Sequence, residues 1–236
     1  MKKKSIAFCL ACLMVAGVWS IGFAESIEET FKKMFPQIKV ESISETKIKG
    51  VYEVVSQNQV GYFAPDPGYL LLGDIVDRNG VNVTANRRNE LIASKAKSLP
   101  LDKALKIGQG KGTIIEFTDP DCPYCRRASA ALRQKTDVTR YIFFFPLPMH
   151  ADAENKVKYI FCSSDRVKAY EQAMQGKLDD QKYDTCRKQE ANDLLKIHKE
   201  AGEKMGINST PFFIVNNKPI SGANMPQIDE ALKQKR

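Results

Sequence analysis

The fold is decided by residues 113–132, which read TIIEFT at 113–118, DPD at 119–121 and CPYCRRASAAL at 122–132. The first segment is rich in β-branched and apolar residues and predicts a buried strand. The last segment carries small and apolar residues at helical spacing and predicts a helix that begins at Cys122. Two cysteines are therefore expected on the first turn of a helix that closely follows a buried strand.

The Cys122–Cys125 pair is a candidate redox centre. A sulfur at the start of a helix faces unpaired backbone N–H groups and the positive end of the helix dipole, and both favour the thiolate. Pro123 suits the first helical position, where its missing N–H is not needed, and Arg126 and Arg127 add positive charge nearby. We therefore expect Cys122 to attack and Cys125, one turn inward, to resolve the mixed disulfide.

Glu116 interrupts the predicted strand six residues before Cys122. A carboxylate inside a central strand needs a reason to be there, and one reason is to accept and return the proton of Cys125 during exchange. The alternative is that this face of the strand is exposed. We predict the proton-relay role for Glu116.

The segment Ser209-Thr210-Pro211 is the third part of the candidate site. A proline that opens a strand is tolerated only where its missing N–H is not needed. If the Thr210–Pro211 bond is cis, the backbone of Thr210 turns toward Cys122 and can pair with an extended client segment. Thr210 and Pro211, together with Pro123 and Tyr124, form the predicted substrate-binding set.

A lone CxxC pair can also be half of a zinc site or a structural bridge. A zinc site needs two more ligands at suitable spacing. His150 and His198 are the only histidines, and neither lies in a paired motif. We therefore expect no metal and no cofactor, and a zinc-binding structural module remains a minor alternative.

Residues 25–84 read as an N-terminal domain. A short helix at 27–34 is followed by β-rich runs, and the Asn79-Gly80 turn precedes an expected strand at 81–84. About sixty residues of this kind bury only a small core. The domain is therefore expected to need a partner, and a second copy of the chain is the simplest choice.

The remainder divides into a connector and a larger domain. Residues 85–106 contain a helical pattern from Asn86 to about Lys97, which we interpret as a linker helix. In residues 107–236 strands and helices alternate, which predicts an α/β domain.

The first 24 residues read as an export signal. Three lysines precede an apolar run, and Gly22-Phe23-Ala24 offers small residues for cleavage after Ala24. An uncleaved membrane anchor is the alternative. Cleavage removes three of the 36 basic residues and none of the 28 acidic ones, which leaves 33 against 28 and a net charge of +5. No basic block is interleaved with aromatic residues, so no nucleic-acid partner is expected.

Cysteine usage agrees with export. Six cysteines become four after cleavage, and an even set in an oxidising compartment suggests pairing. The close spacing of Cys122 and Cys125 favours them as one pair, which leaves Cys162 with Cys186 as a structural bridge. Closing that loop is worth about 3 kcal/mol. A second redox pair is the alternative.

The segment FTDPDCPYCR at 117–126 resembles the active-site segment of the DsbC/DsbG family of periplasmic disulfide isomerases. The resemblance covers nearly the whole mature chain. Residues 51–55 and 69–74 resemble the N-terminal dimerisation domain of that family, and residues 209–211 its cis-proline loop. Residues 145–149 and 158–162 resemble its helical insert.

The resemblance implies a cystatin-like α+β dimerisation domain, a linker helix and a thioredoxin-like α/β domain with a helical insert. It also implies a V-shaped homodimer that shuffles incorrect disulfides in exported proteins, has some chaperone activity and is kept reduced by a membrane thiol donor of the DsbD type. Carried over, Cys122 is the nucleophile, Cys125 the resolving thiol, Thr210-Pro211 the substrate-pairing loop and Cys162–Cys186 the structural bridge.

Two departures from that family keep other functions open. The residues between the thiols are Pro123-Tyr124, where the best-known isomerase has Gly-Tyr, and Glu116 is atypical of that isomerase. Both features are familiar from DsbA oxidases. A thiol oxidase, a dedicated reductase and a holdase chaperone are therefore alternatives on the same scaffold.

Overall fold

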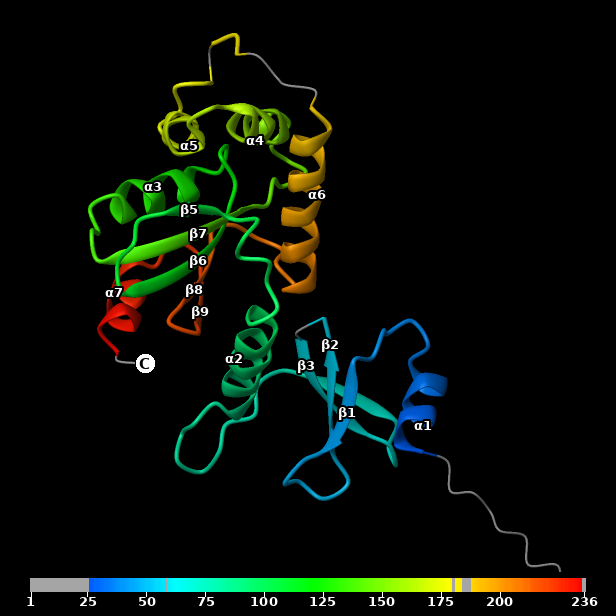
Figure 1. The fold of residues 1–236 in the computed structure, drawn as a ribbon. Coiled ribbons are helices and arrows are strands. Elements are labelled where there is room, and N and C mark those ends of the chain that lie inside the picture. Colours follow the sequence, from blue (N-terminus) through cyan, green and yellow to red (C-terminus); the bar gives the residue numbers. More distant parts are fainter. Residues whose placement is uncertain (1–25, 58, 180, 184–187, 235–236) are drawn as a thin grey trace, which may run out of the picture.

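The computed structural model describes residues 26–57, 59–179, 181–183 and 188–234. The predicted export signal and Cys186 lie outside these residues. Two separate β-sheets lie at opposite ends of the chain, and helix α2 joins them (Figure 1). Among the described residues, no helix has both the length and the apolar character needed to cross a membrane.

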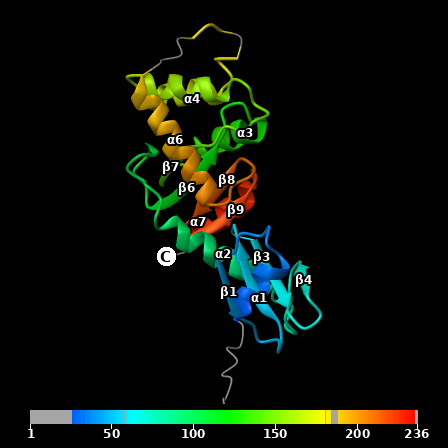
Figure 2. The same ribbon diagram turned by 90° about the vertical axis from the view of Figure 1, so that its right-hand side faces the viewer.

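The N-terminal sheet is an antiparallel meander in the order β1-β2-β3-β4. Its elements are α1 (Ile27–Met34), β1 (Ser42–Glu45), β2 (Tyr52–Ser56), β3 (Gln59–Ala64) and β4 (Tyr69–Leu72). Helix α1 begins with a capping box between Ser26 and Glu29. It packs Phe31 against Val54 and Phe63 to form a small core, as the length of this domain predicts. Figure 2 shows α1 against this sheet.

The predicted strand at 81–84 is wrong. Only a single bridge joins Val76 to Asn82, and helix α2 (Val83–Ala96) begins directly afterwards. The Asn82 side chain accepts a hydrogen bond from the backbone N–H of Ala85, which caps the helix. The Thr84 hydroxyl is buried and lies 2.5 Å from the Tyr62 hydroxyl. These side-chain hydrogen bonds override the β propensity of the segment.

Helix α2 is the predicted linker helix, and it starts three residues earlier than expected. Near its N-terminal end Arg87 forms an ion pair of 2.9 Å with Glu53 of the first sheet. At its other end Ala96 and Leu99 pack into the core of the second domain, beside Phe117. The helix therefore contacts both domains instead of bridging open solvent.

The second sheet has five strands in the order β5-β7-β6-β8-β9. Its strands are β5 (Leu105–Ile107), β6 (Gly112–Thr118), β7 (Val138–Phe144), β8 (Phe212–Val215) and β9 (Lys218–Ser221). Strand β6 is parallel to β7 and antiparallel to β8. The strand predicted at 113–118 is therefore central and buried, as expected.

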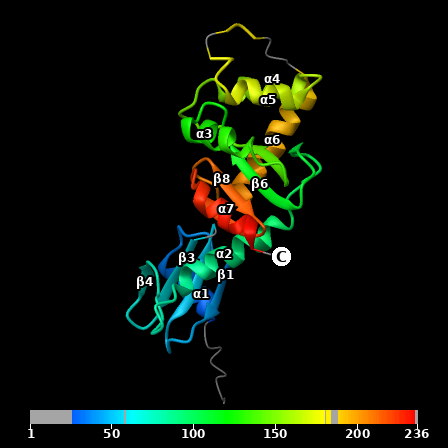
Figure 3. The same ribbon diagram turned by 90° about the vertical axis from the view of Figure 1, so that its left-hand side faces the viewer.

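Helices cover both faces of this sheet. They are α3 (Pro123–Leu132), α4 (Ala153–Cys162), α5 (Arg166–Met174), α6 (Gln189–Lys204) and α7 (Met225–Lys233). Helices α3, α5 and α7 lie on one face, and α6 and the end of α2 pack against the other. Helices α4 and α5 form an insert that extends the layer beyond the sheet (Figure 1). Figure 3 shows α3 and α7 together on the first of these two faces.

Candidate active site

Cys122 lies where strand β6 gives way to helix α3. It is the N-cap residue of α3, and Pro123 occupies the first helical position, as predicted. Cys122 and Cys125 are both free thiols, and both are buried. The Cys122 sulfur lies 3.4 Å from the carbonyl oxygen of Thr210, although the two residues are far apart in the sequence.

The surroundings of Cys122 favour its thiolate. Interaction with the Cys125 thiol, above all, lowers the pKa of Cys122 from 9.0 to about 5. Burial opposes this shift, and the backbone N–H groups of Cys125 and Tyr124 reinforce it. The sulfur makes no capping hydrogen bond within the usual distance limits, so these N–H groups act mainly as dipoles.

Cys125 has the opposite character. Burial, above all, raises its pKa far above the ordinary value, and its interaction with Cys122 adds to this effect. The hydroxyls of Thr118 and Thr210 act in the other direction. The pair therefore holds one ionised sulfur and one protonated sulfur at neutral pH, as a nucleophile and a resolving thiol require.

The structure brings the third part of the predicted site to the thiols. The Thr210–Pro211 peptide bond is cis, and Pro211 directly precedes strand β8. Tyr124 is 57% exposed beside the nucleophile, so its ring is available to a client. The predicted substrate-binding residues thus surround Cys122, and their role in binding stays a prediction.

Glu116 is fully buried, but its carboxylate is already engaged. Arg140 Nη2 donates to Glu116 Oε2 at 2.6 Å and to the Tyr170 hydroxyl oxygen at 2.9 Å. The Tyr170 hydroxyl donates to Glu116 Oε1 at 3.4 Å and lies 3.0 Å from the Ser129 hydroxyl. Burial is the largest single effect and lowers the pKa of Arg140, but the charge of Glu116, the interaction with Tyr170 and the hydrogen bonds to both together outweigh burial and raise the pKa overall. The proton-relay role of Glu116 stays a prediction. A relay would have to work with the Glu116 carboxylate paired to Arg140.

A second cluster of charged side chains forms ion pairs with Asp121, the residue before Cys122. Lys156 on α4 is almost fully buried and contacts Asp121 and Asp179. Arg126 forms ion pairs with the same two carboxylates and donates to the carbonyl oxygen of Pro120 at 2.6 Å. The cluster therefore ties the active-site loop to the helical insert. It also neutralises Arg126, which was expected to supply positive charge to the thiols.

The loop before Cys122 is fixed from the other side by Asp119. Its carboxylate accepts from the backbone N–H of Asp121 at 2.8 Å and of Leu147 at 2.7 Å, and lies 2.7 Å from His150 Nδ1. Its carbonyl oxygen accepts from the backbone N–H of Cys122. Asp119 thus sets the position at which the chain enters helix α3.

Two family profiles divide the chain between them. The profile described as the disulfide bond isomerase protein N-terminal domain matches residues 22–85. The profile described as a thioredoxin-like domain matches residues 99–233, which is more than half of the chain. The chain belongs to the thioredoxin-like family. The predicted resemblance to the DsbC/DsbG group and the predicted fold class are confirmed by this combination.

Known relatives support the same conclusion. The thiol:disulfide interchange protein DsbC of Dickeya dadantii is 27% identical, over 96% of this chain and 92% of the relative. DsbC of Escherichia coli K12 is 28% identical, over 87% of this chain and 86% of the relative. The catalytic domain of Proteus mirabilis ScsC superposes with a TM-score of 0.50 at 22% identity, over 62% of this chain and 99% of that domain. This last match supports the thioredoxin-like fold alone.

Cys162 ends helix α4 in the insert of the thioredoxin-like domain and is disulfide-bonded. Its predicted partner, Cys186, lies outside the described residues, so the Cys162–Cys186 pairing stays a prediction. His198, one of the two histidines that a zinc site would have to use, is buried. One ring nitrogen lies 2.9 Å from the Phe144 backbone nitrogen and the other lies 2.9 Å from the Lys103 carbonyl oxygen.

Sequence reasoning missed the charged partners around the thioredoxin-like active site. Arg140 stands inside an apolar strand just as Glu116 does. Two opposite charges inside two apolar strands are a signal in the sequence, but that signal does not show that the two strands are neighbours. Lys156 gave no such signal, because the same helix carries a second lysine, Lys158, which is only partly buried. Lysine spacing alone does not show which one is buried.

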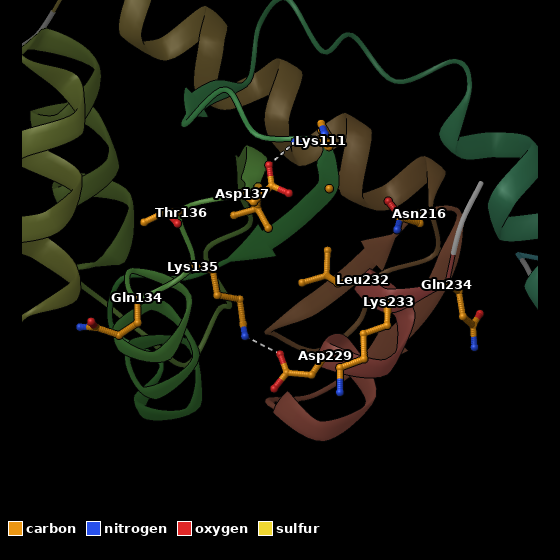
Figure 4. A pocket seen from close by; sticks show the side chains of 12 residues that line it. Lys111, Gln134, Lys135, Thr136, Asp137, Asn216, Asp229, Leu232, Lys233 and Gln234 are labelled. Atoms are coloured by element: carbon orange, nitrogen blue, oxygen red, sulfur yellow. Dashed lines mark hydrogen bonds and ion pairs between the residues drawn. The ribbon is translucent and has the colours of Figure 1, made fainter.

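The surface of the thioredoxin-like domain also has a hollow that lies away from the two thiols. It has a volume of about 730 Å³ and is lined by Lys111, Asp137, Asp229 and their neighbours (Figure 4). It opens beside Gly112, at the end of β6 opposite to Cys122. This hollow is therefore not part of the thiol site of the thioredoxin-like domain.

Proposed function

We propose that this chain is a periplasmic thiol:disulfide interchange enzyme that isomerises incorrect disulfides in exported proteins. The observation that carries the proposal is the split between the two thiols: the pKa of Cys122 is lowered to about 5, and that of Cys125 is raised. The relatives named thiol:disulfide interchange protein bear out the enzyme class. Isomerisation as the net reaction, and exported proteins as the clients, are proposals that go beyond this enzyme class.

The reaction follows from the geometry of the pair. The Cys122 thiolate attacks a client disulfide, one client sulfur leaves as a thiolate, and a mixed disulfide forms. If the released client thiolate attacks another client disulfide, a new client disulfide forms and a different client thiolate is freed. That thiolate then attacks the client sulfur of the mixed disulfide and expels Cys122 as a thiolate, so the net reaction is isomerisation. If Cys125 attacks first, the client is reduced and the Cys122–Cys125 disulfide forms, which a membrane thiol donor of the DsbD type would have to reduce.

We propose that client segments bind at the four predicted substrate-binding residues around Cys122. Pro123 and Tyr124 border Cys122 on the helix side, and Thr210 and Pro211 border it on the loop side. An extended client segment would pair with the backbone of Thr210 while its sulfur reaches Cys122. Such a surface would also hold unfolded clients, which is the basis of the proposed chaperone activity.

The N-terminal domain is proposed to form a homodimer. Strand β4 is an edge strand of the first sheet, and its Leu72 side chain is 81% exposed. Tyr69 and Leu71 on the same strand are also exposed. Exposed apolar side chains on an open edge favour pairing with another strand.

A charged substitution tests the dimer. Leu72→Lys should convert the protein to a monomer in analytical ultracentrifugation, because a buried unpaired lysine at the edge opposes association. Ile48→Lys, at another exposed apolar residue of the same domain, is the matched control and should leave the oligomeric state unchanged. A Leu72→Lys protein that sediments as the wild type does would contradict the proposed interface.

A thiol oxidase is the second candidate, and two observations favour it. A strongly stabilised thiolate favours the reduced pair and therefore makes the disulfide more oxidising. Pro123 directly after Cys122 also resembles the DsbA oxidases. The redox state of the pair in growing cells separates the two: an isomerase is expected to be mostly reduced, whereas a pair found oxidised at steady state would favour the oxidase.

A trapping experiment tests the order of attack. In Cys125→Ser the mixed disulfide cannot be resolved, so covalent adducts with exported proteins should accumulate and be recovered from cells. Cys122→Ser should abolish exchange altogether. The absence of any Cys125→Ser adduct, with Cys122 still reactive, would contradict the division of roles.

A further inference from the structure

A hollow lies beside the nucleophile on the side away from the helical insert. It has a volume of about 510 Å³. One wall comes from helix α3, through Tyr124, Arg127 and Ala128, and the other from the segment 221–225 between β9 and α7. The hollow therefore opens within two residues of Cys122 along the chain.

Hydrogen bonds connect the far wall of this hollow to the thiol site. The backbone N–H of Gly222 donates to the carbonyl oxygen of Pro211 at 2.9 Å, and the preceding carbonyl, of Thr210, lies 3.4 Å from the Cys122 sulfur. An extended chain advances about 3.3 Å per residue. A client segment paired at Thr210 would thus bring a side chain one to three residues from its cysteine into the hollow.

The hollow is electropositive. The Arg127 guanidinium carbon lies 4.6 Å from the centre of the Tyr124 ring, and Arg127 has no carboxylate partner among the described residues. Its neighbour Arg126, by contrast, is neutralised by two aspartates. None of the described residues that line the hollow is acidic, and helix α7 begins in its wall, with its positive end there.

The hollow also has room for a side chain. Gly222 in its wall adopts a φ of +74°, and a Cβ placed on it would meet no atom within 4 Å. The Tyr124 ring holds the guanidinium by a cation–π contact, so less side-chain entropy is lost when an anion binds.

We propose that this hollow binds an acidic side chain of the client segment, one to three residues from the client cysteine, through Arg127. The inference rests on the proposed function, since it assigns a client preference to the same thiols. An acidic residue near the client sulfur would otherwise be repelled by the Cys122 thiolate, so Arg127 widens the range of disulfides that can be attacked.

The test uses three peptides that are identical except for Glu, Gln or Lys two residues after a single cysteine. Each cysteine carries a small uncharged thiol as a mixed disulfide. The Cys122 thiolate of the reduced full-length protein attacks the peptide sulfur and forms a new S–S bond. The small thiol leaves as a thiolate and takes a proton from water. Cys125 then releases the reduced peptide, and the protein pair becomes the disulfide.

We expect the Glu peptide to react about three- to fivefold faster than the Gln peptide at low salt, which is the upper part of the range for an exposed ion pair. The Lys peptide should be slower than both, and the preference should shrink as salt screens the charges. In Arg127→Gln the Glu and Gln peptides should react equally, and Arg127→Glu should prefer the Lys peptide. Peptides with the charged residue at other positions around the cysteine show how far from the client sulfur an acidic side chain is still recognised.

The matched control is Arg133→Gln. Arg133 caps the far end of the same helix and lies 3.9 Å from Glu171, so its loss should leave the peptide preference unchanged. Equal wild-type rates for all charges, or a Glu preference that survives in Arg127→Gln, would overturn the assigned site while Cys122 remains reactive. Failure of every peptide to react would instead contradict the proposed function.

Discussion

Replacing Arg140 by Met removes the only cation that contacts the Glu116 carboxylate among the described residues. Arg140 is 4% exposed and Glu116 is 0% exposed, and their charged atoms lie 2.6 Å apart. Removing one partner of a buried ion pair leaves an uncompensated charge, which costs about 3–5 kcal/mol. In a chain of this size each kcal/mol lowers the melting temperature by about 2–4 °C. A loss of about 4 kcal/mol therefore corresponds to about 8–16 °C.

Urea unfolding of the reduced protein at neutral pH measures this loss. Arg133→Met is the control, because its ion pair is partly exposed and should be worth less than about 1 kcal/mol. In the double variant Glu116→Gln, Arg140→Met neither group is charged, so the total loss should be at least about 2 kcal/mol smaller than the sum of the single losses. An Arg140→Met loss below about 1 kcal/mol, or a strictly additive double variant, would refute the reasoning.

Two further predictions concern the rest of the catalytic domain. Lys156→Met leaves Asp121 and Asp179 with Arg126 alone, so urea unfolding should show a loss of about 1–3 kcal/mol, and a Lys156→Arg variant that loses as much would count against the ion-pair account. Burial lowers the pKa of His198 from 6.5 to about 4. The unfolded chain therefore binds a proton before the folded chain does, and up to about 3 kcal/mol of stability present above pH 6.5 should be lost as pH falls to about 4. His198→Gln should flatten this part of the stability profile, and an unchanged slope would contradict the assignment.

The redox segment could be predicted from the sequence because its signals are local. A strand, a thiol at a helix N-cap and a proline at the first helical position need only neighbouring residues, and the structure confirms each of them at 112–132. The residues alone left the isomer of the Thr210–Pro211 bond open, and only the family resemblance implied a cis-proline loop; in the structure the bond is cis. Local rules for helix capping and backbone geometry were therefore sufficient to predict most of the candidate site.

The errors arose where side chains interact over longer distances. Residues 81–84 have a β-rich pattern, but the Asn82 cap and the buried Thr84 hydroxyl place Val83 in a helix. Strand β1 was not among the predicted β-rich runs, because Ser42–Glu45 has little apolar character. Pairing between Glu116 and Arg140 depends on the order of β6 and β7, which the sequence pattern alone does not specify.

The most direct test of the redox assignment is the rate at which Cys122 is alkylated as a function of pH in the reduced protein. Only the thiolate reacts, so the rate should reach half its maximum near pH 5, the value expected from the surroundings of the sulfur. A Cys122→Ser variant corrects for any other thiol. A midpoint near pH 8.5, about that of an ordinary exposed thiol, would contradict a nucleophile held ionised at the start of helix α3.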